Sequence, residues 1–236
     1  ARGRPVCPLC RSYLAGLDDI PQGATGVMRV EEGKAAVWVV WARPLSSLDL
    51  LLEVNYGHDW VNAPYELGHT AAFTVAESDG KTDIATANVT SQVVPGWGGW
   101  TGFTTILGDP WAPEQPDLEP GDWVYGEVDN GSEAQVQLGE IAGLLDLAGD
   151  SVAGTISLPG AFEAAAWCAV WVDGGPEIWF DLPTGGADFT CDLGAAGWDL
   201  RPGQDVAVGY VDPMGHRVIN MFREGGYTVF LPLVTR

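Results

Sequence analysis

The chain is poor in cations. It has 11 Lys and Arg against 32 Asp and Glu, a formal net charge of −21 over 236 residues. Between Pro44 and Leu200 there are 25 acids and a single cation, Lys81, whereas residues 1–17 carry three Arg and no acid. An acidic body repels nucleic-acid phosphates and anionic membrane surfaces, so the composition argues against both as partners.

Long apolar runs and helical periodicity are also scarce. No run of 18 apolar residues occurs, so we expect no membrane insertion. Only Arg11–Leu17 and Glu140–Leu147 space their apolar residues as a helical turn or two would require. The chain starts at Ala1 without Met, as a mature protein does once its leader has been removed. We therefore expect a secreted protein that works outside the cell or on its surface.

The common signatures of catalytic sites are missing as well. The three His, at His58, His69 and His216, belong to no Gly-x-Ser-x-Gly or His-Glu-x-x-His motif, and no glycine-rich loop precedes a helix. A pair of carboxylates could hydrolyse a glycoside, but among 32 acids no pair stands out. We predict that the protein is not an enzyme and holds no cofactor.

The chain contains only four Cys, and these fit a secreted protein that is stabilised by disulfides. Cys168 and Cys191 lie in two strand-like segments and are predicted to pair. Cys7 and Cys10 form either a local disulfide or a bridge elsewhere. Arg11 stands where haem attachment needs His, and the Cys spacing does not suit zinc, so no metal site is predicted at the Cys.

What the chain does have is an internal repeat. The phrase Pro116–Val124 (PDLEPGDWV) returns as Trp198–Val206 (WDLRPGQDV), and each copy runs on to Val-Asp and a glycine. Similarity at this level predicts two related modules. Along the whole chain, strand-like segments of about five residues alternate with turn signals, which is typical of β-sandwiches.

We therefore expect an all-β protein of two tandem immunoglobulin-like β-sandwich modules with extra terminal strands. The expected parts are an N-terminal extension with a hairpin (1–45), a first sandwich (46–140), a second sandwich (147–224) and an apolar strand (225–236). Six Trp lie in strand-like segments and are expected in the cores: Trp38, Trp41, Trp123, Trp167, Trp171 and Trp179.

The first module resembles a known family pattern. Gly68, Phe73 and Val75, the turn Asp79-Gly80 and the run Asp117–Val124 are similar to bacterial immunoglobulin-like and carboxypeptidase-regulatory-like β-sandwich repeats. The resemblance implies tandem sandwiches on secreted or surface proteins of bacteria. Its motif is one of folding, so it implies nothing about chemistry.

Two loops of the first module have no counterpart in the second. They carry Trp97, Trp100 and Trp111 among Gly and Pro, and we expect these indoles to form an exposed or intersubunit aromatic surface. Sugar rings stack on such indoles while neighbouring carboxylates accept their hydroxyls. A polysaccharide-binding module is therefore an alternative function.

Acidic turns suggest two further features. Glu77–Asp83 and Asp129–Glu133 could bind Ca²⁺, although both read first as hairpin turns and neither has the EF-hand spacing. Asn88 and Asn130 head glycosylation sequons, which matter only in a host that glycosylates its secreted proteins.

The C-terminal residues are strongly apolar, and a segment of this kind has to be buried against protein. Pro232 cannot donate to a ladder, so a strand here belongs at a sheet edge, and Gly225-Gly226 form a flexible joint before it. We expect this segment to pair with another subunit, with docking onto its own chain as the alternative.

The leading function is thus a structural or adhesive protein, a homo-oligomer or filament joined by terminal strands. The expected assembly residues are Tyr227, Val229, Phe230, Leu231, Leu233 and Val234.

Overall fold

The computed structural model describes residues 25–32, 35–42, 50–94, 100–172 and 174–224. The chain divides into two compact units, Ala1–Asp49 and Leu50–Arg236. In the first unit, β1 (Thr25–Glu32) pairs antiparallel with β2 (Ala35–Ala42), and Glu32 lies opposite Ala35. This hairpin falls in the extension where the sequence suggests one.

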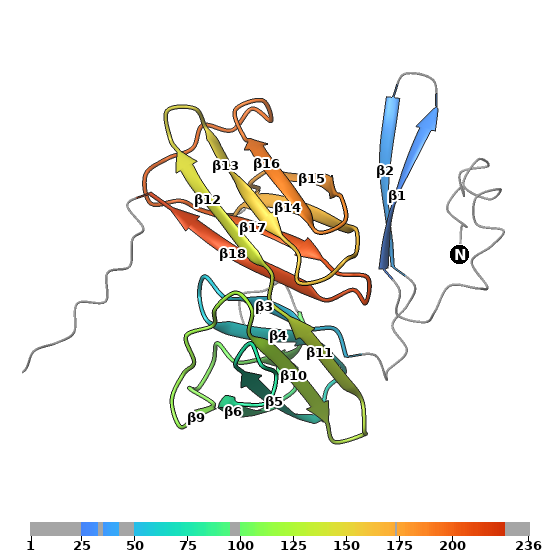
Figure 1. Ribbon diagram of the computed structural model, residues 1–236, viewed down its shortest axis with the longest axis vertical. Helices are drawn as coiled ribbons and strands as arrows, with labels where there is room; N and C mark the ends of the chain where they lie inside the picture. The colour runs from blue at the N-terminus through green and yellow to red at the C-terminus, as the bar shows by residue number, and fades with distance from the viewer. Residues whose placement is uncertain (1–24, 33–34, 43–49, 95–99, 173, 225–236) are drawn as a thin grey trace, which may run out of the picture. The chain divides into compact units, whose positions relative to one another are not determined.

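The second unit is built from two β-sandwiches (Figure 1). In the first, a five-stranded sheet of order β11-β10-β5-β6-β9 covers strands β3, β4, β8 and β7. In the second, a three-stranded sheet of order β12-β13-β16 covers β15, β14, β17 and β18. The all-β sandwich prediction is confirmed. The strands are β3 (Glu53–Asn55), β4 (Trp60–Pro64), β5 (Thr70–Ala76), β6 (Asp83–Thr90), β7 (Gln92–Val93), β8 (Thr101–Thr104), β9 (Trp111–Ala112), β10 (Trp123–Val128), β11 (Glu133–Gln137), β12 (Glu140–Asp146), β13 (Ser151–Ser157), β14 (Ala164–Val170), β15 (Glu177–Leu182), β16 (Gly186–Asp192), β17 (Asp205–Val211) and β18 (Arg217–Arg223).

The two sandwiches repeat one topology. The order β11-β10-β5-β6 in the first corresponds to β18-β17-β14-β15 in the second, and β3-β4-β8 corresponds to β12-β13-β16. The repeated phrase precedes β10 in one copy and leads into β17 in the other. The similarity seen in the sequence is therefore a similarity of fold.

The sandwiches are fused through a shared sheet. β18 of the second pairs in parallel with β3 of the first, so that Val218 lies beside Val54. This pairing makes one eight-stranded sheet of order β15-β14-β17-β18-β3-β4-β8-β7. A single cluster of buried side chains also runs from Phe73 in the first sandwich to Tyr210 in the second. The two modules thus form one unit instead of two beads on a linker.

Side chains seal this junction. The backbone N–H of Leu52 donates to His216 Nδ1 at 3.1 Å, and the Arg217 N–H donates to the Leu52 carbonyl at 2.8 Å. The Tyr56 hydroxyl accepts from the Ile141 N–H at 2.7 Å and donates to its carbonyl at 3.1 Å. The buried Tyr210 hydroxyl accepts from the Gly139 N–H at 2.9 Å. Burial raises the pKa of both tyrosines well above their usual value, so both hydroxyls keep their protons.

The repeated phrase forms the same turn in both copies. In Leu-x-Pro-Gly, the glycine adopts a positive φ of 101° at Gly121 and 84° at Gly203, which only glycine accommodates readily. The preceding Leu118 and Leu200 are buried in the core. An Asp from another loop holds each turn in place. Asp59 accepts from the Leu118 N–H at 2.9 Å, and Asp150 accepts from the Leu200 N–H at 2.8 Å.

We expect Asp150→Ala to lower the free energy of unfolding by about 2 kcal/mol, because the Leu200 N–H loses its acceptor. Asp150 also has a φ of 47°, a conformation that Asp and Asn tolerate better than Ala. Urea titration of the purified protein measures the loss. Asp150→Asn keeps the side-chain oxygen and should restore most of it. Equal losses in both variants would contradict the assignment.

The predicted disulfide is confirmed. Cys168 on β14 bonds to Cys191 on β16, with Cα atoms 6.3 Å apart and both residues fully buried. The bond therefore joins the two sheets of the second sandwich.

Glu140–Leu147, where the spacing fits a helical turn, is instead strand β12 paired with β13. Leu144, which a helix would bury with Ile141, is 74% exposed. The second sandwich therefore begins at Glu140, ahead of the expected start at residue 147. Across the described part of the chain, no helix is long and apolar enough to span a membrane.

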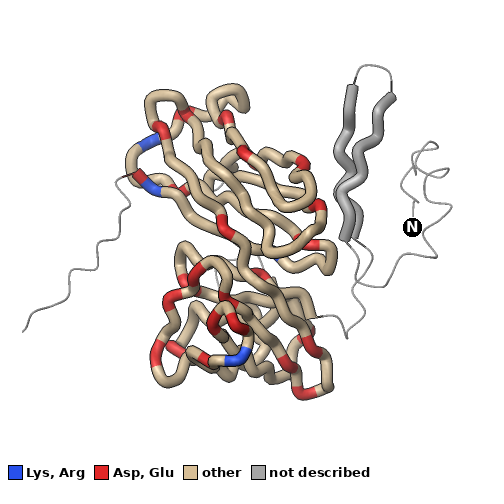
Figure 2. The backbone as a smooth tube through the Cα atoms, in the orientation of Figure 1, with Lys and Arg blue, Asp and Glu red and all other residues tan. Residues whose placement is uncertain are grey.

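Acidic residues lie over both sandwiches, and basic ones are rare (Figure 2). Within residues 50–224 the cations are Lys81, Arg201, Arg217 and Arg223. The last two lie on β18, where Arg217 contacts Glu53 at 3.4 Å and Arg223 Nη2 contacts Asp205 at 2.7 Å. Both Arg of β18 therefore lie beside acidic side chains.

Candidate functional site

The outer face of the eight-stranded sheet is rich in tryptophan. Along β14, Ala166, Cys168 and Val170 face the core, so Trp167 points to the opposite side. There it packs against Trp179 of β15, with ring centroids 6.3 Å apart. This second cluster also includes Trp60, Ala207 and Ile219.

The expectation that the strand tryptophans fill the sandwich cores is wrong for Trp167, Trp171 and Trp179, which lie on the outside of the sheet. It is also wrong for Trp123, which is half-buried and stacks on Tyr125. The Cys168 position carried the missing signal: a disulfide between two facing sheets must point inward, which sends its odd-numbered neighbours outward. Trp38 and Trp41 lie on β2, where the side chains are not described.

Exposure increases towards one end of this face. Trp167 is 8% exposed, Trp179 is half-buried and Trp171 is 46% exposed. Trp171 stacks on His58 with centroids 6.0 Å apart and planes 8° from parallel, and it also contacts Trp60. Ile178 and Phe180 of β15 are also half-buried and lie on the core side of the same strand. We name the residues of both faces at this end of the sheet the aromatic edge: Trp167, Trp171, Ile178, Trp179 and Phe180.

The middle of the same face is shielded and holds unpaired polar atoms. Asn55 and Asn62 are fully buried, yet Asn55 Nδ2, both amide atoms of Asn62 and Trp167 Nε1 have no hydrogen-bond partner. Such a composition suits contact with protein better than contact with water.

β15 is also a free edge of the sheet. β14 pairs with one side of it, and no described strand pairs with the other. The Val170 N–H donates to the Pro176 carbonyl, so by alternation Ile178, Phe180 and Leu182 direct their backbone groups to β14. Glu177, Trp179 and Asp181 therefore direct their N–H and C=O groups outward.

The structure does not unite the three loop tryptophans. Trp111 on β9 is 6% exposed and belongs to the core of the first sandwich, so the expectation of exposure is wrong for this residue. It lies in the same buried cluster as Ala85 and Ala87 of the neighbouring strand β6. Trp100 is half-buried and its ring lies over Gly102, while Trp97 lies outside the described residues.

The structure describes only some of the other residues that were expected to form sites. Cys7, Cys10 and the segment Tyr227–Val234 lie outside the described residues. In the loop 77–83, Asp79 accepts from the Lys81 and Thr82 N–H groups and the Thr82 hydroxyl, which lowers its pKa. Where side chains are described, no group of three or more His, Cys, Asp or Glu is placed to hold a metal ion. Calcium binding stays a prediction.

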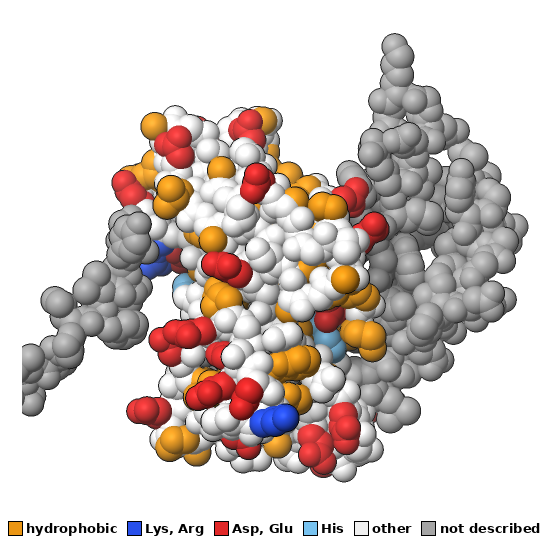
Figure 3. Space-filling view, viewed as in Figure 1, with side chains coloured by type: hydrophobic (Ala, Val, Ile, Leu, Met, Phe, Trp, Pro, Cys, Tyr) orange, Lys and Arg blue, Asp and Glu red, His pale blue; other side chains and the backbone are white. Residues whose placement is uncertain are grey.

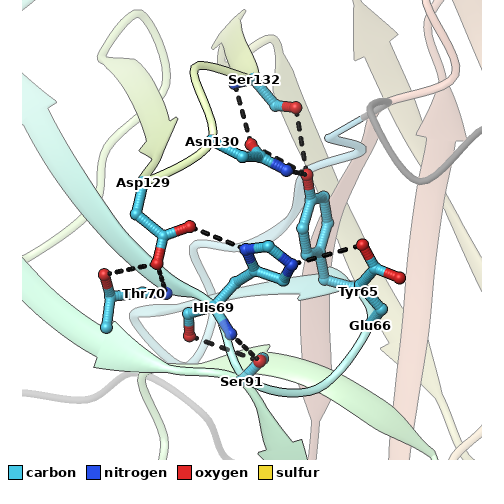
Figure 4. A network of polar contacts seen from close by, with 8 residues as sticks. All are labelled: Tyr65, Glu66, His69, Thr70, Ser91, Asp129, Asn130 and Ser132. Atoms are coloured by element: carbon cyan, nitrogen blue, oxygen red, sulfur yellow. Dashed lines mark hydrogen bonds and ion pairs between the residues drawn. The ribbon is translucent and has the colours of Figure 1, made fainter.

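A polar network lies at one end of the first sandwich (Figure 4). His69 lies just before β5, and its Nδ1 is hydrogen-bonded to Asp129 Oδ1 at 2.7 Å. Its Nε2 lies 3.3 Å from Glu66 Oε1. Asp129 Oδ2 accepts from the Thr70 N–H at 2.8 Å. The Asn130 amide is bonded to the Tyr65 hydroxyl at 2.8 Å. The network ties the β4–β5 loop to the β10–β11 turn.

This network is not arranged as a catalytic triad. The second nitrogen of His69 faces the Glu66 carboxylate, where a triad would place a hydroxyl. Ser91 bonds only to the His69 backbone, and Ser132 bonds to Tyr65. The arrangement can hold a proton between two carboxylates, which raises the pKa of His69 and lowers that of Asp129.

These shifts predict a pH dependence for the network. The raised pKa of His69 gives stability that is present below about pH 6.5 and is lost as the pH rises through the folded value. The lowered pKa of Asp129 gives stability that is present above about pH 3.9 and is lost on further acidification. Urea titration should therefore show a larger penalty for His69→Gln at pH 5.5 than at pH 8.5. Adding Asp129→Asn should remove that difference, and a penalty that does not change with pH would contradict the account.

No model of a known protein family matches the chain, and no curated protein matches it. Several solved structures are weakly similar, among them the following two. One is a tetra-tandem repeat from the extending region of a large adhesion protein, with 14% identity and a TM-score of 0.24 over 84% of this chain and 56% of that one. The other is a structure that concerns the host cell surface retention of a 1.5-MDa bacterial ice-binding adhesin, with 9% identity and a TM-score of 0.22 over 75% of this chain and 63% of that one. The chain spans less than two thirds of either structure, and likeness this weak carries no information on function.

Proposed function

We propose that this protein is a non-enzymatic structural or adhesive component of an extracellular assembly, and that its copies associate through the aromatic edge. The observation that carries the proposal is the eight-stranded sheet shared by both sandwiches. Hydrogen-bonded strands and one continuous core join the two modules. A mechanical force applied to one module is therefore transmitted to the other without passing through a flexible linker.

Two further observations support this function. The buried inter-sheet disulfide fits an oxidising location outside the cytosol. The acidic surface keeps the unit soluble and repels unspecific contacts, and the face seen in Figure 3 carries acidic side chains throughout. An apolar edge within such a surface is then a specific place of contact.

Electron microscopy of the purified full chain tests the proposal. We expect filaments or regular oligomers that grow with protein concentration. Particles that remain monomeric at every concentration and salt level would contradict it.

Carbohydrate binding is the second candidate, and the exposed indole of Trp171 favours it. At 46% exposure this ring can stack on a sugar, whereas the buried Trp111 cannot. A soluble polysaccharide panel separates the two functions: a binding module would lose affinity on Trp171→Ala and remain monomeric, and a structural subunit would bind no glycan.

A further inference from the structure

We propose that the partner of β15 is the segment Tyr227–Val234 of a second copy, which adds to the eight-stranded sheet as a ninth strand. This inference rests on the assembly proposed above and names its two contacting parts. A strand added to a sheet edge gains main-chain hydrogen bonds, while its alternate side chains fill pockets on the two faces.

The acceptor edge is open and apolar. Glu177, Trp179 and Asp181 offer outward N–H and C=O groups, as the pairing with β14 requires. Trp179 flanks this edge on the outer face of the sheet, and Ile178 and Phe180 flank it on the core side. All three are half-buried, so an added strand would cover apolar surface on both sides.

The donor segment matches this edge in length and polarity. β15 has six residues, and the segment YTVFLPLV has eight with no charge among them. Pro232 has no N–H, so its side of the strand must face away from β15. By alternation, Val229, Leu231 and Leu233 then face β15, and their three N–H groups meet the three outward-facing residues of the acceptor.

The same chain reaches its own β15 only with a fully extended link. β17 and β14 lie between β18 and β15, so a ninth strand lies four strand spacings from β18, about 19 Å. Arg223 ends β18, and the six steps from there to Val229, the first residue that would face β15, span at most about 22 Å. A self-contact therefore leaves almost no slack for crossing β17 and β14, whereas a second copy can supply the strand freely. Repeating the contact between copies produces a head-to-tail chain.

Charge favours the same pairing. Arg236 is the one charged residue in 225–236 of the sequence, and Glu177 and Asp181 border the acceptor edge. A cation just beyond the donor strand is therefore attracted to the rim of the neighbouring copy.

Two variants of the full chain separate donor from acceptor. Asp181→Pro removes an outward N–H without removing a hydrogen bond to β14, and Asp181→Ala is its control because it keeps that N–H. Leu231→Asp places a charge in the donor segment and leaves the described sandwiches untouched. Near-ultraviolet circular dichroism checks that each variant is folded.

Sedimentation velocity gives the readout. We expect the wild type and Asp181→Ala to assemble, and Asp181→Pro and Leu231→Asp to sediment as monomers. An equimolar mixture of the two monomeric variants should form a dimer and stop there, because one intact donor meets one intact acceptor.

Assembly of either blocked variant to the wild-type size, or a mixture without dimers, would overturn the inference and leave the proposed function standing. A wild type that is monomeric throughout would overturn both. If Asp181→Pro does not fold, Leu231→Asp decides the donor side alone, since assembly by that variant contradicts the inference.

Discussion

Replacing Cys168 and Cys191 together by Ala is expected to lower the free energy of unfolding by about 3 kcal/mol, because a cross-link over 23 positions restricts the unfolded chain. The bond joins β14 to β16, and both Cys are fully buried, so the native packing loses two sulfur atoms as well. Urea unfolding of wild type and variant under oxidising conditions measures the effect.

Adding a reductant provides the control for this prediction. It should destabilise the wild type by a similar amount and leave the Ala variant unchanged. A variant as stable as the wild type would show that the disulfide contributes nothing to holding the two sheets together.

Replacing His216 by Ala is expected to cost about 3 kcal/mol, because the buried Leu52 N–H loses its acceptor and a cavity replaces the imidazole. The loss falls on the junction itself, next to the bond from the Arg217 N–H to the Leu52 carbonyl. His216→Asn offers an oxygen near the position of Nδ1 and should recover part of the loss. Equal destabilisation by Ala and Asn would contradict a specific hydrogen bond.

The same residue makes the junction sensitive to acid. Burial lowers the pKa of His216, and the nearby Asp212 opposes this only in part. Below about pH 6.5 the unfolded chain therefore binds a proton that the folded His216 does not bind. The free energy of unfolding decreases as the pH is lowered through that range. His216→Asn should remove this slope, which is opposite in sign to that of His69.

Local sequence patterns predict most strands because each sandwich buries one face of every strand. In β10 (Trp123–Val128) the buried residues alternate with less buried ones, and the turn residues Pro120-Gly121 come just before its start. The pattern at Glu140–Leu147 misleads because Ile141, Leu144 and Leu145 fit a helix equally well. There the Tyr56 hydroxyl and the Asn220 amide, both distant in sequence, hold the Ile141 carbonyl in the strand.

The shared sheet could not be predicted in this way. Leu52 and His216 are 164 residues apart, and nothing in either local pattern specifies a parallel pairing between β18 and β3. The site shows the same limit. Trp179 reads as a core residue by composition, and only the inward direction of Cys168 shows that its neighbour Trp167 and the partner Trp179 lie outside.

The central claim is that the two sandwiches behave as one mechanical unit. Native-state hydrogen exchange, read by mass spectrometry in the variant without the Cys168–Cys191 bond, tests it most directly. Because the sheet and the core are continuous, we expect the opening free energy to fall together in β14 and β17 of the second sandwich and in β5 and β10 of the first. Faster exchange in β14 and β17 alone, with β5 and β10 unchanged, would contradict it.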